Sequence, residues 1–239
     1  MKKLRKQSSL FVKEKLAIDL NSLLDEIGIG EYCTLLSQPD GVGDGTYPEP
    51  RKIYIQYETA FKDSVHPYVE SSVMLEIGAR SLIEPTAKAK VKSLIETNSP
   101  VSTTLIDSEI ITAMPQKTFL EKVFLLHELF ATEGCASANR KSRHLYDLES
   151  MMDKSFALSA VHDEELWENI RHHRSIFTPI KGIDYKAPIR ENLLLTPPSR
   201  YMNVWKDDYS TMQEQMVHGR SISFEELLSR MKELQSRFQ

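Results

Sequence analysis

The spacing of hydrophobic residues along the chain predicts a long helix near its start. Leucine and isoleucine recur every three or four positions from Leu16 to Ile27, and Gly28 and Gly30 follow directly. A stripe with this period buries one face of a helix, and glycine is common just beyond a helix end. We therefore expect an amphipathic helix over residues 3–27.

Three segments that follow have the alternation or the short apolar runs typical of β-strands. They are residues 51–59, 71–81 and 102–114. The Gly/Pro/Asp-rich segment 37–50 predicts a loop before the first of these strands. A helix is predicted over residues 86–96, between the second strand and the third. The first half of the chain is thus predicted to form an antiparallel or mixed sheet with helices.

Beyond Pro115 the pattern becomes helical throughout. Residues 118–130 are apolar on most sides, which predicts a buried helix. In the last predicted helix Ser223 and Glu226 have the spacing of a capping box. The other predicted helices cover residues 139–152, 163–174 and 207–217. The predicted fold class is α+β, with a sheet domain over residues 1–115 and an all-helical domain over residues 116–239.

Composition narrows the class of protein. The 239 residues are 41% hydrophobic and 27% charged, with a net charge of −4, so no global basic character indicates nucleic-acid binding. Lysine and arginine are dense in the first fifteen residues, but the apolar run there is too short for a signal peptide. Cys33 and Cys135 have neither a metal-binding spacing nor a disulfide framework. We expect a reducing, cytoplasmic setting, with no membrane span.

Lys122 is the sharpest candidate for chemistry, because it lies within an otherwise largely apolar helix. It either pairs with Glu121 or Glu128 at the helix surface or points into a cleft, where its ammonium group would hold a phosphate. Thr118 lies one turn earlier, on the same side of the predicted helix.

A second candidate is the charged stripe formed by Arg140, Arg143, His144 and Asp147, which lie three or four residues apart. An Arg143–Asp147 pair is a common feature of helix surfaces and stabilises a helix by only a few tenths of a kcal/mol. Two arginines beside one acid also leave positive charge for a phosphate. Both interpretations stay open at this point.

Acidic residues in the predicted strands have two interpretations as well. Glu76 interrupts an apolar strand, and it points either to solvent or into a site. Asp107 and Glu109 place two carboxylates on one strand face, where they either hold Mg²⁺ or face water, and the position of this strand favours water. His127, in an apolar helix, is expected to be a core residue, and the adjacent His172 and His173 make a poor metal pair.

Five segments, taken in order, resemble the AbiEii/AbiGii family of nucleotidyltransferase toxins from bacterial abortive-infection systems. They are VMLEIGARSLIEP (73–85), PQKTFLEKVFLLHEL (115–129), RKSRHLYDLESM (140–151), WKDDYSTM (205–212) and SFEELLSRMKELQ (223–235). The resemblance covers most of residues 50–239. It implies transfer of a nucleotide from an NTP to an RNA, with tRNA as the expected acceptor, and neutralisation by a cognate antitoxin.

The resemblance also assigns roles to individual residues. It implies that Lys122 helps to hold the nucleotide phosphates, that Asp147 belongs to the active site, and that Arg143 is the arginine preceding that acid. Glu76 matches an isolated acid that nucleotidyltransferase folds carry on a later strand. Together with Thr118, the predicted site is therefore catalytic at Asp147 and Glu76 and nucleotide-binding at Lys122, Arg143 and Thr118. We expect these residues to face one cleft between the two halves.

One part of the family's pattern is missing from this chain. The family's Gly-Ser pair, followed by an Asp-x-Asp that binds Mg²⁺, does not occur in the sequence, and KKLRKQSSLFV resembles the helix that normally follows that motif. We expect a chain that begins inside the family's catalytic domain, with no metal ligands of its own and with an exposed sheet edge suited to self-association. It is either an enzyme whose missing motif lies on another polypeptide or an inactive remnant that binds RNA or antitoxin.

Overall fold

The computed structural model describes residues 2–41, 50–58, 70–79, 82, 84–92 and 108–239. The chain is divided into two compact units, residues 1–81 and residues 82–239, and each unit is described by itself. Both units combine helices with antiparallel strands, so the predicted α+β fold class is confirmed.

The first unit begins with one continuous helical segment. It consists of α1 (Lys2–Phe11), a π-helical turn (Val12–Leu16) and α2 (Ala17–Glu26). Gly28 follows with a φ of +77°, a left-handed backbone conformation that glycine adopts without steric cost. The helix predicted over residues 3–27 is confirmed.

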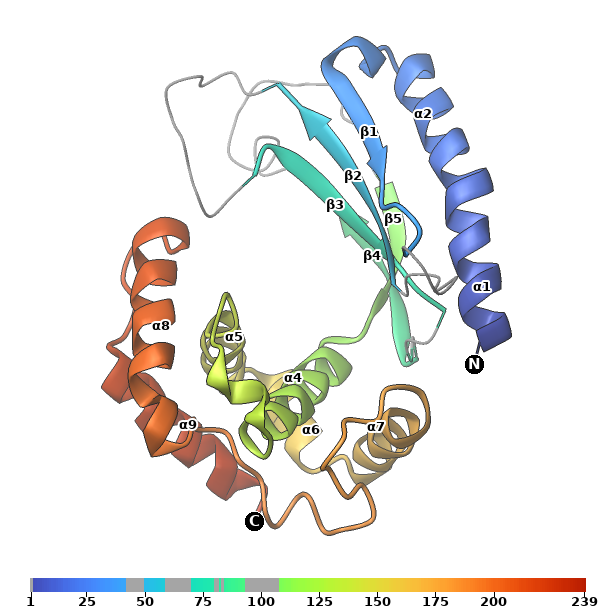
Figure 1. Cartoon of the computed structure of the whole chain (residues 1–239). Helices are drawn as coiled ribbons and strands as arrows, with labels where there is room; N and C mark the ends of the chain where they lie inside the picture. Colours follow the sequence, from blue (N-terminus) through green and yellow to red (C-terminus); the bar gives the residue numbers. More distant parts are fainter. Residues whose placement is uncertain (1, 42–49, 59–69, 80–81, 83, 93–107) are drawn as a thin grey trace. The chain divides into compact units, whose positions relative to one another are not determined.

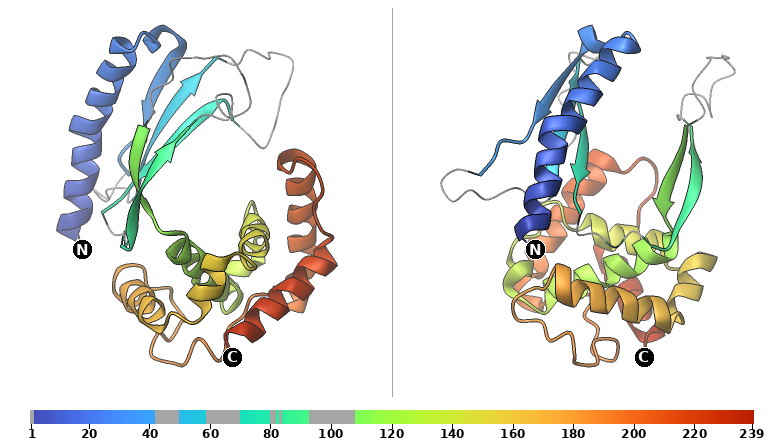
Figure 2. Two further views of the ribbon diagram at one scale, coloured as in Figure 1. Left: turned by 180° about the vertical axis from the view of Figure 1, so that it is seen from behind. Right: turned by 90° about the vertical axis from the view of Figure 1, so that its right-hand side faces the viewer.

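A three-stranded antiparallel sheet packs against this helix, as Figures 1 and 2 show. Its strands are β1 (Cys33–Ser37), β2 (Arg51–Tyr57) and β3 (Ser72–Ile77), in the order β1-β2-β3. On the covered face Ile53 lies opposite Leu75 and is fully buried with Val12. Strands β2 and β3 were predicted, whereas β1 was not. The predicted self-association through a sheet edge stays a prediction.

A second, two-stranded sheet belongs to the other unit and corrects one prediction. Strand β4 (Thr86–Val91) pairs antiparallel with β5 (Ser108–Ala113). The helix predicted over residues 86–96 is therefore wrong for Thr86–Val91, and residues 93–96 lie outside the described residues. Alanine and lysine are good helix formers, but here they alternate with period two, and backbone pairing with β5 outweighs their intrinsic preference. The beginning of the third predicted strand, residues 102–107, also lies outside the described residues.

The rest of the second unit is helical (Figure 1). The predicted helices are all present, and α6 is an additional one. Buried side chains of α4, α5, α7, α8 and α9 share a single hydrophobic core, in which Phe119, Leu145 and Trp205 are fully buried. The helices are α4 (Pro115–Phe130), α5 (Arg143–Met151), α6 (Ser155–Val161), α7 (Glu164–Phe177), α8 (Met202–Met216) and α9 (Phe224–Arg237).

Three smaller predictions concern boundaries and single residues. The first compact unit ends at residue 81 and the second begins at residue 82, because strands β4 and β5 group with the helices. The predicted boundary between a sheet domain over residues 1–115 and a helical domain over residues 116–239 stays a prediction. Ser223 caps α9 by accepting a hydrogen bond from the Glu226 backbone N–H, as the capping-box spacing predicted. Both cysteines are free. In the described part of the chain, every helix is too short or too polar to cross a membrane.

Candidate functional site

An ion pair between α4 and α5 joins two of the predicted site residues. The Lys122 Nζ lies 2.6 Å from the Asp147 Oδ2, and 23% of the Lys122 side chain and 38% of the Asp147 side chain are exposed. Two other pairings were considered from the sequence, that of Lys122 with Glu121 or Glu128 and that of Asp147 with Arg143, and neither is present among the described contacts. Glu121 and Glu128 bind Arg174 instead of Lys122, and the described contacts of Asp147 include no ion pair with Arg143.

The sequence of α4 explains why Lys122 lies at the edge of the core. Phe119, Leu120 and Val123, which lie within three residues of Lys122, are fully buried in the core. Lys122 lies beside this buried face and directs its ammonium group to α5. Thr118, four residues earlier, is exposed on the same side of the helix, as predicted.

The predicted charged stripe is only partly present, because α5 begins at Arg143. Arg140 lies in the preceding turn with a φ of +57°, so the prediction that it continues the helical stripe is wrong. Arg143 itself is exposed, and within the described residues it has no hydrogen-bond or ion-pair partner. Its guanidinium group is thus available to an anion near the Lys122–Asp147 pair.

His144 contributes a neutral ring to the same part of α5. Burial, together with the positive charges of Lys122 and Arg143, lowers the pKa of His144 to about 4. Its Nδ1 atom is buried and has no hydrogen-bond partner among the described residues. The sequence placed His144 on the stripe but assigned it no role, and its neutrality depends on neighbours that come from another helix.

The turn that leads into α5 is held by α8. Asp208 accepts hydrogen bonds from the backbone N–H groups of Arg140 and Ser142, over 2.7 Å and 3.0 Å, and from the Ser142 hydroxyl. Trp205 donates from its indole Nε1 to the Cys135 carbonyl over 2.9 Å. Trp205 and Asp208 lie in the WKDDYSTM segment, one of the five segments that carry the family resemblance. The sequence alone did not predict their contacts with the turn.

Glu76 belongs to the first unit, whereas the other four predicted site residues belong to the second. It points from the sheet face opposite the helix, where it lies across from Lys52 in the register of β2 and β3. The Lys52 Nζ is 2.9 Å from the Glu76 Oε1, and this hydrogen bond raises the pKa of Lys52. The predicted common cleft for Glu76, Lys122, Arg143 and Asp147 stays a prediction.

The described carboxylates do not fit a Mg²⁺ site. No three histidine, cysteine, aspartate or glutamate residues form a metal-binding group in the described part of the chain. Glu76 and Asp147 each pair with a lysine, and Glu109 pairs with Lys88 at 2.9 Å on an exposed strand face. A lysine at the oxygens that would bind the ion competes with it. Asp107 lies outside the described residues.

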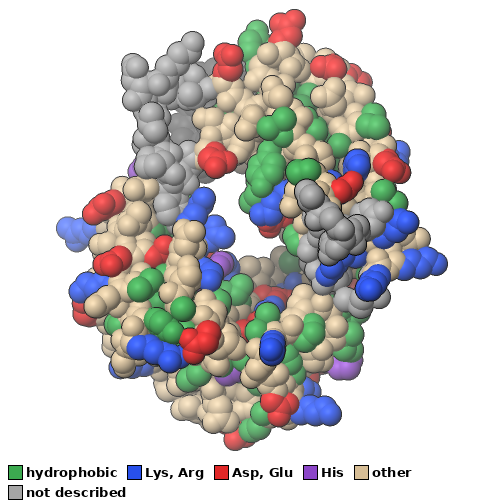
Figure 3. Space-filling view, in the orientation of Figure 1, with side chains coloured by type: hydrophobic (Ala, Val, Ile, Leu, Met, Phe, Trp, Pro, Cys, Tyr) green, Lys and Arg blue, Asp and Glu red, His purple; other side chains and the backbone are tan. Residues whose placement is uncertain are grey.

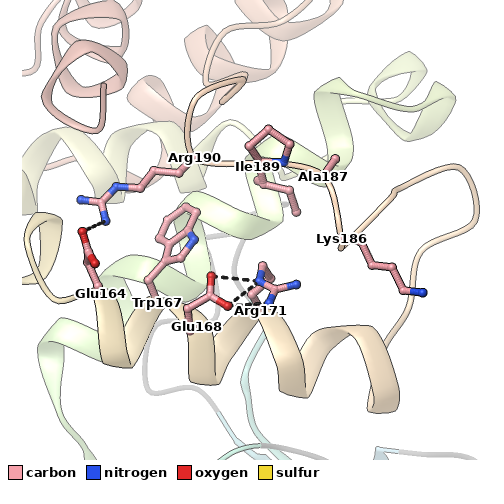
Figure 4. Close-up of a pocket in the computed structure, with 9 residues that line it drawn as sticks. Glu164, Trp167, Glu168, Arg171, Lys186, Ala187, Ile189 and Arg190 are labelled. Atoms are coloured by element: carbon pink, nitrogen blue, oxygen red, sulfur yellow. Dashed lines mark hydrogen bonds and ion pairs between the residues drawn. The ribbon is translucent and has the colours of Figure 1, made fainter.

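Two cavities in the second unit lie elsewhere. The first, of about 350 Å³, is lined by Trp167, and its arginines are already engaged: Arg171 binds Glu168, and Arg190 lies 3.9 Å from Glu164 (Figure 4). The second, of about 840 Å³, lies between α7 and the start of β4. Neither cavity is lined by a predicted site residue.

The first turns of α1 carry a second concentration of positive charge. Lysine and arginine side chains gather at the N-terminal end of this helix (Figure 3), and Lys2, Lys3 and Lys6 are exposed. Such a group suits the phosphates of a nucleic acid, although exposed charges of this kind also serve simply to keep a surface hydrated.

Comparison with known proteins connects this chain to a protein family. A protein-family model described as "Nucleotidyl transferase AbiEii toxin, Type IV TA system" matches residues 12–230, which include both helices of the Lys122–Asp147 pair. A search of curated proteins found no match, and a search of solved structures found none either.

Proposed function

Because this chain belongs to the AbiEii family of nucleotidyl transferase toxins of type IV toxin–antitoxin systems, we propose that it serves the transfer of a nucleotide from an NTP to an RNA. The expected acceptor is a tRNA, and the expected regulator is a cognate antitoxin. The observation that supports this role best is the pairing of Lys122 with Asp147 beside Arg143, whose guanidinium group has no ion-pair partner among the described residues.

In this proposal, Lys122 and Arg143 bind the phosphates of the NTP. An ammonium group acts as a compact point charge, and a guanidinium group offers a planar set of donors that matches phosphate oxygens. Asp147 orients the Lys122 ammonium group over 2.6 Å, and Thr118 offers a hydroxyl one turn earlier. Asp147 and Glu76 are the two proposed catalytic acids.

Metal chemistry is not assigned to the described residues. The family implies Mg²⁺, but the sequence lacks the Asp-x-Asp motif, and the candidate acids Glu76 and Asp147 are each paired with a lysine. Nucleotide binding by this chain is therefore proposed to rest on Lys122 and Arg143. Transfer to RNA is proposed to need metal-binding carboxylates from another polypeptide.

The pairing of Glu76 and Asp147 with lysines also favours an alternative function. A chain whose candidate acids are held by lysines could bind RNA or the antitoxin without performing transfer. The exposed lysines at the start of α1 supply a surface for the RNA backbone in that case. The two functions differ in one measurable respect: transfer requires specific binding of an NTP at Lys122, and a binding module does not.

Nucleotide binding to purified variants tests the proposal. We expect Lys122→Ala to weaken the binding of each NTP roughly tenfold to a hundredfold at low salt, as is typical for the loss of a hydrogen bond to a charged group. Lys181→Ala, which removes an exposed lysine distant in sequence, is the matched control and should bind like the wild type. Equal affinity of the two variants would contradict a nucleotide site at Lys122.

A further inference from the structure

The segment between α4 and α5 is fastened to α8 at two points. The indole N–H of Trp205 binds the Cys135 carbonyl, and Trp205 itself is fully buried. The Asp208 carboxylate, 66 residues from Ser142 in sequence, binds the end of the same segment directly before α5. The first residue of α5 is thus placed by contacts from a helix far along the chain.

Asp208 accepts hydrogen bonds from backbone N–H groups at the start of α5, where the helix has no cap from its own N-terminal residue. Ser142, the residue before the helix, does not cap it through its own side chain, and instead donates its hydroxyl to Asp208. Both Asp208 oxygens are used, since Oδ1 binds the Arg140 N–H and Oδ2 binds the Ser142 N–H. A carboxylate at this place also compensates the positive end of the helix dipole.

The backbone at Arg140 makes this contact more important. Its φ of +57° is uncommon for a residue other than glycine, so the turn keeps this conformation only when neighbouring groups hold it. The bond from the Arg140 N–H to the Asp208 carboxylate is one contact that holds the backbone at this position. Without this bond the turn can relax to a conformation of lower energy, and α5 begins only three residues later, at Arg143.

We propose that Asp208 is a positioning residue for the nucleotide site, because its bonds to Arg140 and Ser142 orient Arg143, His144 and Asp147 toward Lys122. The inference rests on the proposed function, since it gives that site a determinant on α8. Asp208 itself is assigned no contact with substrate. Trp205 supports the same segment nearer to α4.

The titration of His144 reports directly on this positioning. The charged groups that act on its ring are Lys122 from α4, Lys141 from the turn, and Arg143 and Asp147 from α5. Asp208→Ala should let the first turn of α5 open, which hydrates the ring and relieves the burial that keeps its pKa low. Removing a negative charge acts in the opposite direction, since it makes the imidazolium form less favourable. A rise in pKa therefore indicates lost positioning rather than a direct charge effect.

The experiment follows the His144 ring signals by NMR between pH 3.5 and 8 in the full chain, and His144→Gln assigns those signals. The control is Asp207→Ala, because the Asp207 side chain is exposed and Asp207 directly precedes Asp208. In the wild type and in this control, His144 should titrate near pH 4. In Asp208→Ala the pKa of His144 should rise toward the ordinary value of about 6.5. Asp208→Asn, which retains one acceptor oxygen, should lie between them and serves if the alanine variant does not fold.

An unchanged or lowered pKa of His144 in Asp208→Ala and Asp208→Asn overturns the inference. NTP binding is measured on the same samples, and we expect Asp208→Ala to lose about as much affinity as Lys122→Ala while Asp207→Ala loses none. Failure of the proposed function has a different signature: the wild type would bind no NTP although the titration of His144 moves as expected.

Discussion

At the residue scale, the exposure of Lys122 and Asp147 separates their role in stability from their role in binding. An ion pair that water reaches from several sides typically contributes no more than about 1 kcal/mol to stability. We therefore expect Lys122→Met and Asp147→Asn each to change the free energy of unfolding by less than about 1 kcal/mol. Urea denaturation measures this quantity. A loss of several kcal/mol in either variant would show that the pair is mainly structural.

One buried and one half-buried histidine predict sensitivity of the fold to mild acid. Burial lowers the pKa of both His127 and His144, and the Nδ1 of His127 accepts a hydrogen bond from the Leu194 N–H. Between the ordinary histidine pKa of about 6.5 and the lower folded values, the unfolded chain binds more protons than the folded chain. The stabilisation is therefore complete above pH 6.5 and is lost as the pH falls toward 4.

The expected loss for His144 between pH 7.5 and pH 5 is on the order of 1–2 kcal/mol in the free energy of unfolding. Urea denaturation at the two pH values measures it. His144→Gln should reduce the pH dependence, whereas His172→Gln, at an exposed position of α7, should retain it. If His144→Gln and the wild type lose equal stability on acidification, the ring of His144 is not kept neutral by the fold.

At the scale of elements, a buried ionic network joins α4 to α7. Arg174 binds Glu121 and Glu128, whose side chains are 25% and 5% exposed. The Tyr185 hydroxyl donates to the Glu128 Oε1 over 2.6 Å, and burial together with this bond raises the pKa of Tyr185 to about 12. The network fixes how these two helices pack. The sequence offered Glu121 and Glu128 as alternative partners of Lys122, but it did not predict their pairing with Arg174.

Removing the central acid of this network should be costly. Glu128→Ala leaves the nearly buried Arg174 with only one of its two carboxylates and leaves the Tyr185 hydroxyl without its acceptor. We expect a loss of about 3 kcal/mol in the free energy of unfolding. Glu168→Ala is the control, because its pair with Arg171 is exposed and should contribute less than about 1 kcal/mol. Thermal and urea denaturation of both variants decide between the two outcomes.

At the scale of the whole molecule, the charges of the chain suit nucleotide binding better than transfer. Lys122 and Arg143 offset part of the charge of a triphosphate, but Glu76 and Asp147 are each paired with a lysine, and the described residues contain no metal-binding group of three. In phosphoryl and nucleotidyl transfer, Mg²⁺ bridges the phosphates and orients them for in-line attack. We expect the purified chain to bind NTPs weakly and to label no RNA with any of the four radioactive NTPs in Mg²⁺.

The salt and metal dependence of binding gives a further readout of the same prediction. Binding through exposed cations should weaken as ionic strength rises, and it should be the same in Mg²⁺ and in EDTA. Strong RNA labelling that Lys122→Ala abolishes would contradict the prediction. Asp107 and Glu109 would then be the first acids to replace, because they are the one acid-x-acid pair in a predicted strand of this chain.

The sequence predicted those elements whose hydrophobic period is strong. The helices and the strands β2 and β3 follow from periods of 3.6 and two, because one face of each must be buried. Strand β4 was missed, since its alanines and lysines prefer a helix until β5 supplies a pairing partner. The short strand β1 and the helix α6 have few residues over which a period can be recognised.

The sequence by itself determined the elements with a strong hydrophobic period, the family to which the chain belongs, and the presence of Lys122, Arg143 and Asp147 as unusual charges on two helices. Only the tertiary structure decided their partners. Lys122 pairs with Asp147 rather than with its neighbours on α4, and Asp208 reaches the start of α5 from α8. Period and propensity describe interactions within a few residues, whereas these contacts join residues 25 and 66 positions apart. Such contacts exist only after the shared hydrophobic core has brought the helices together.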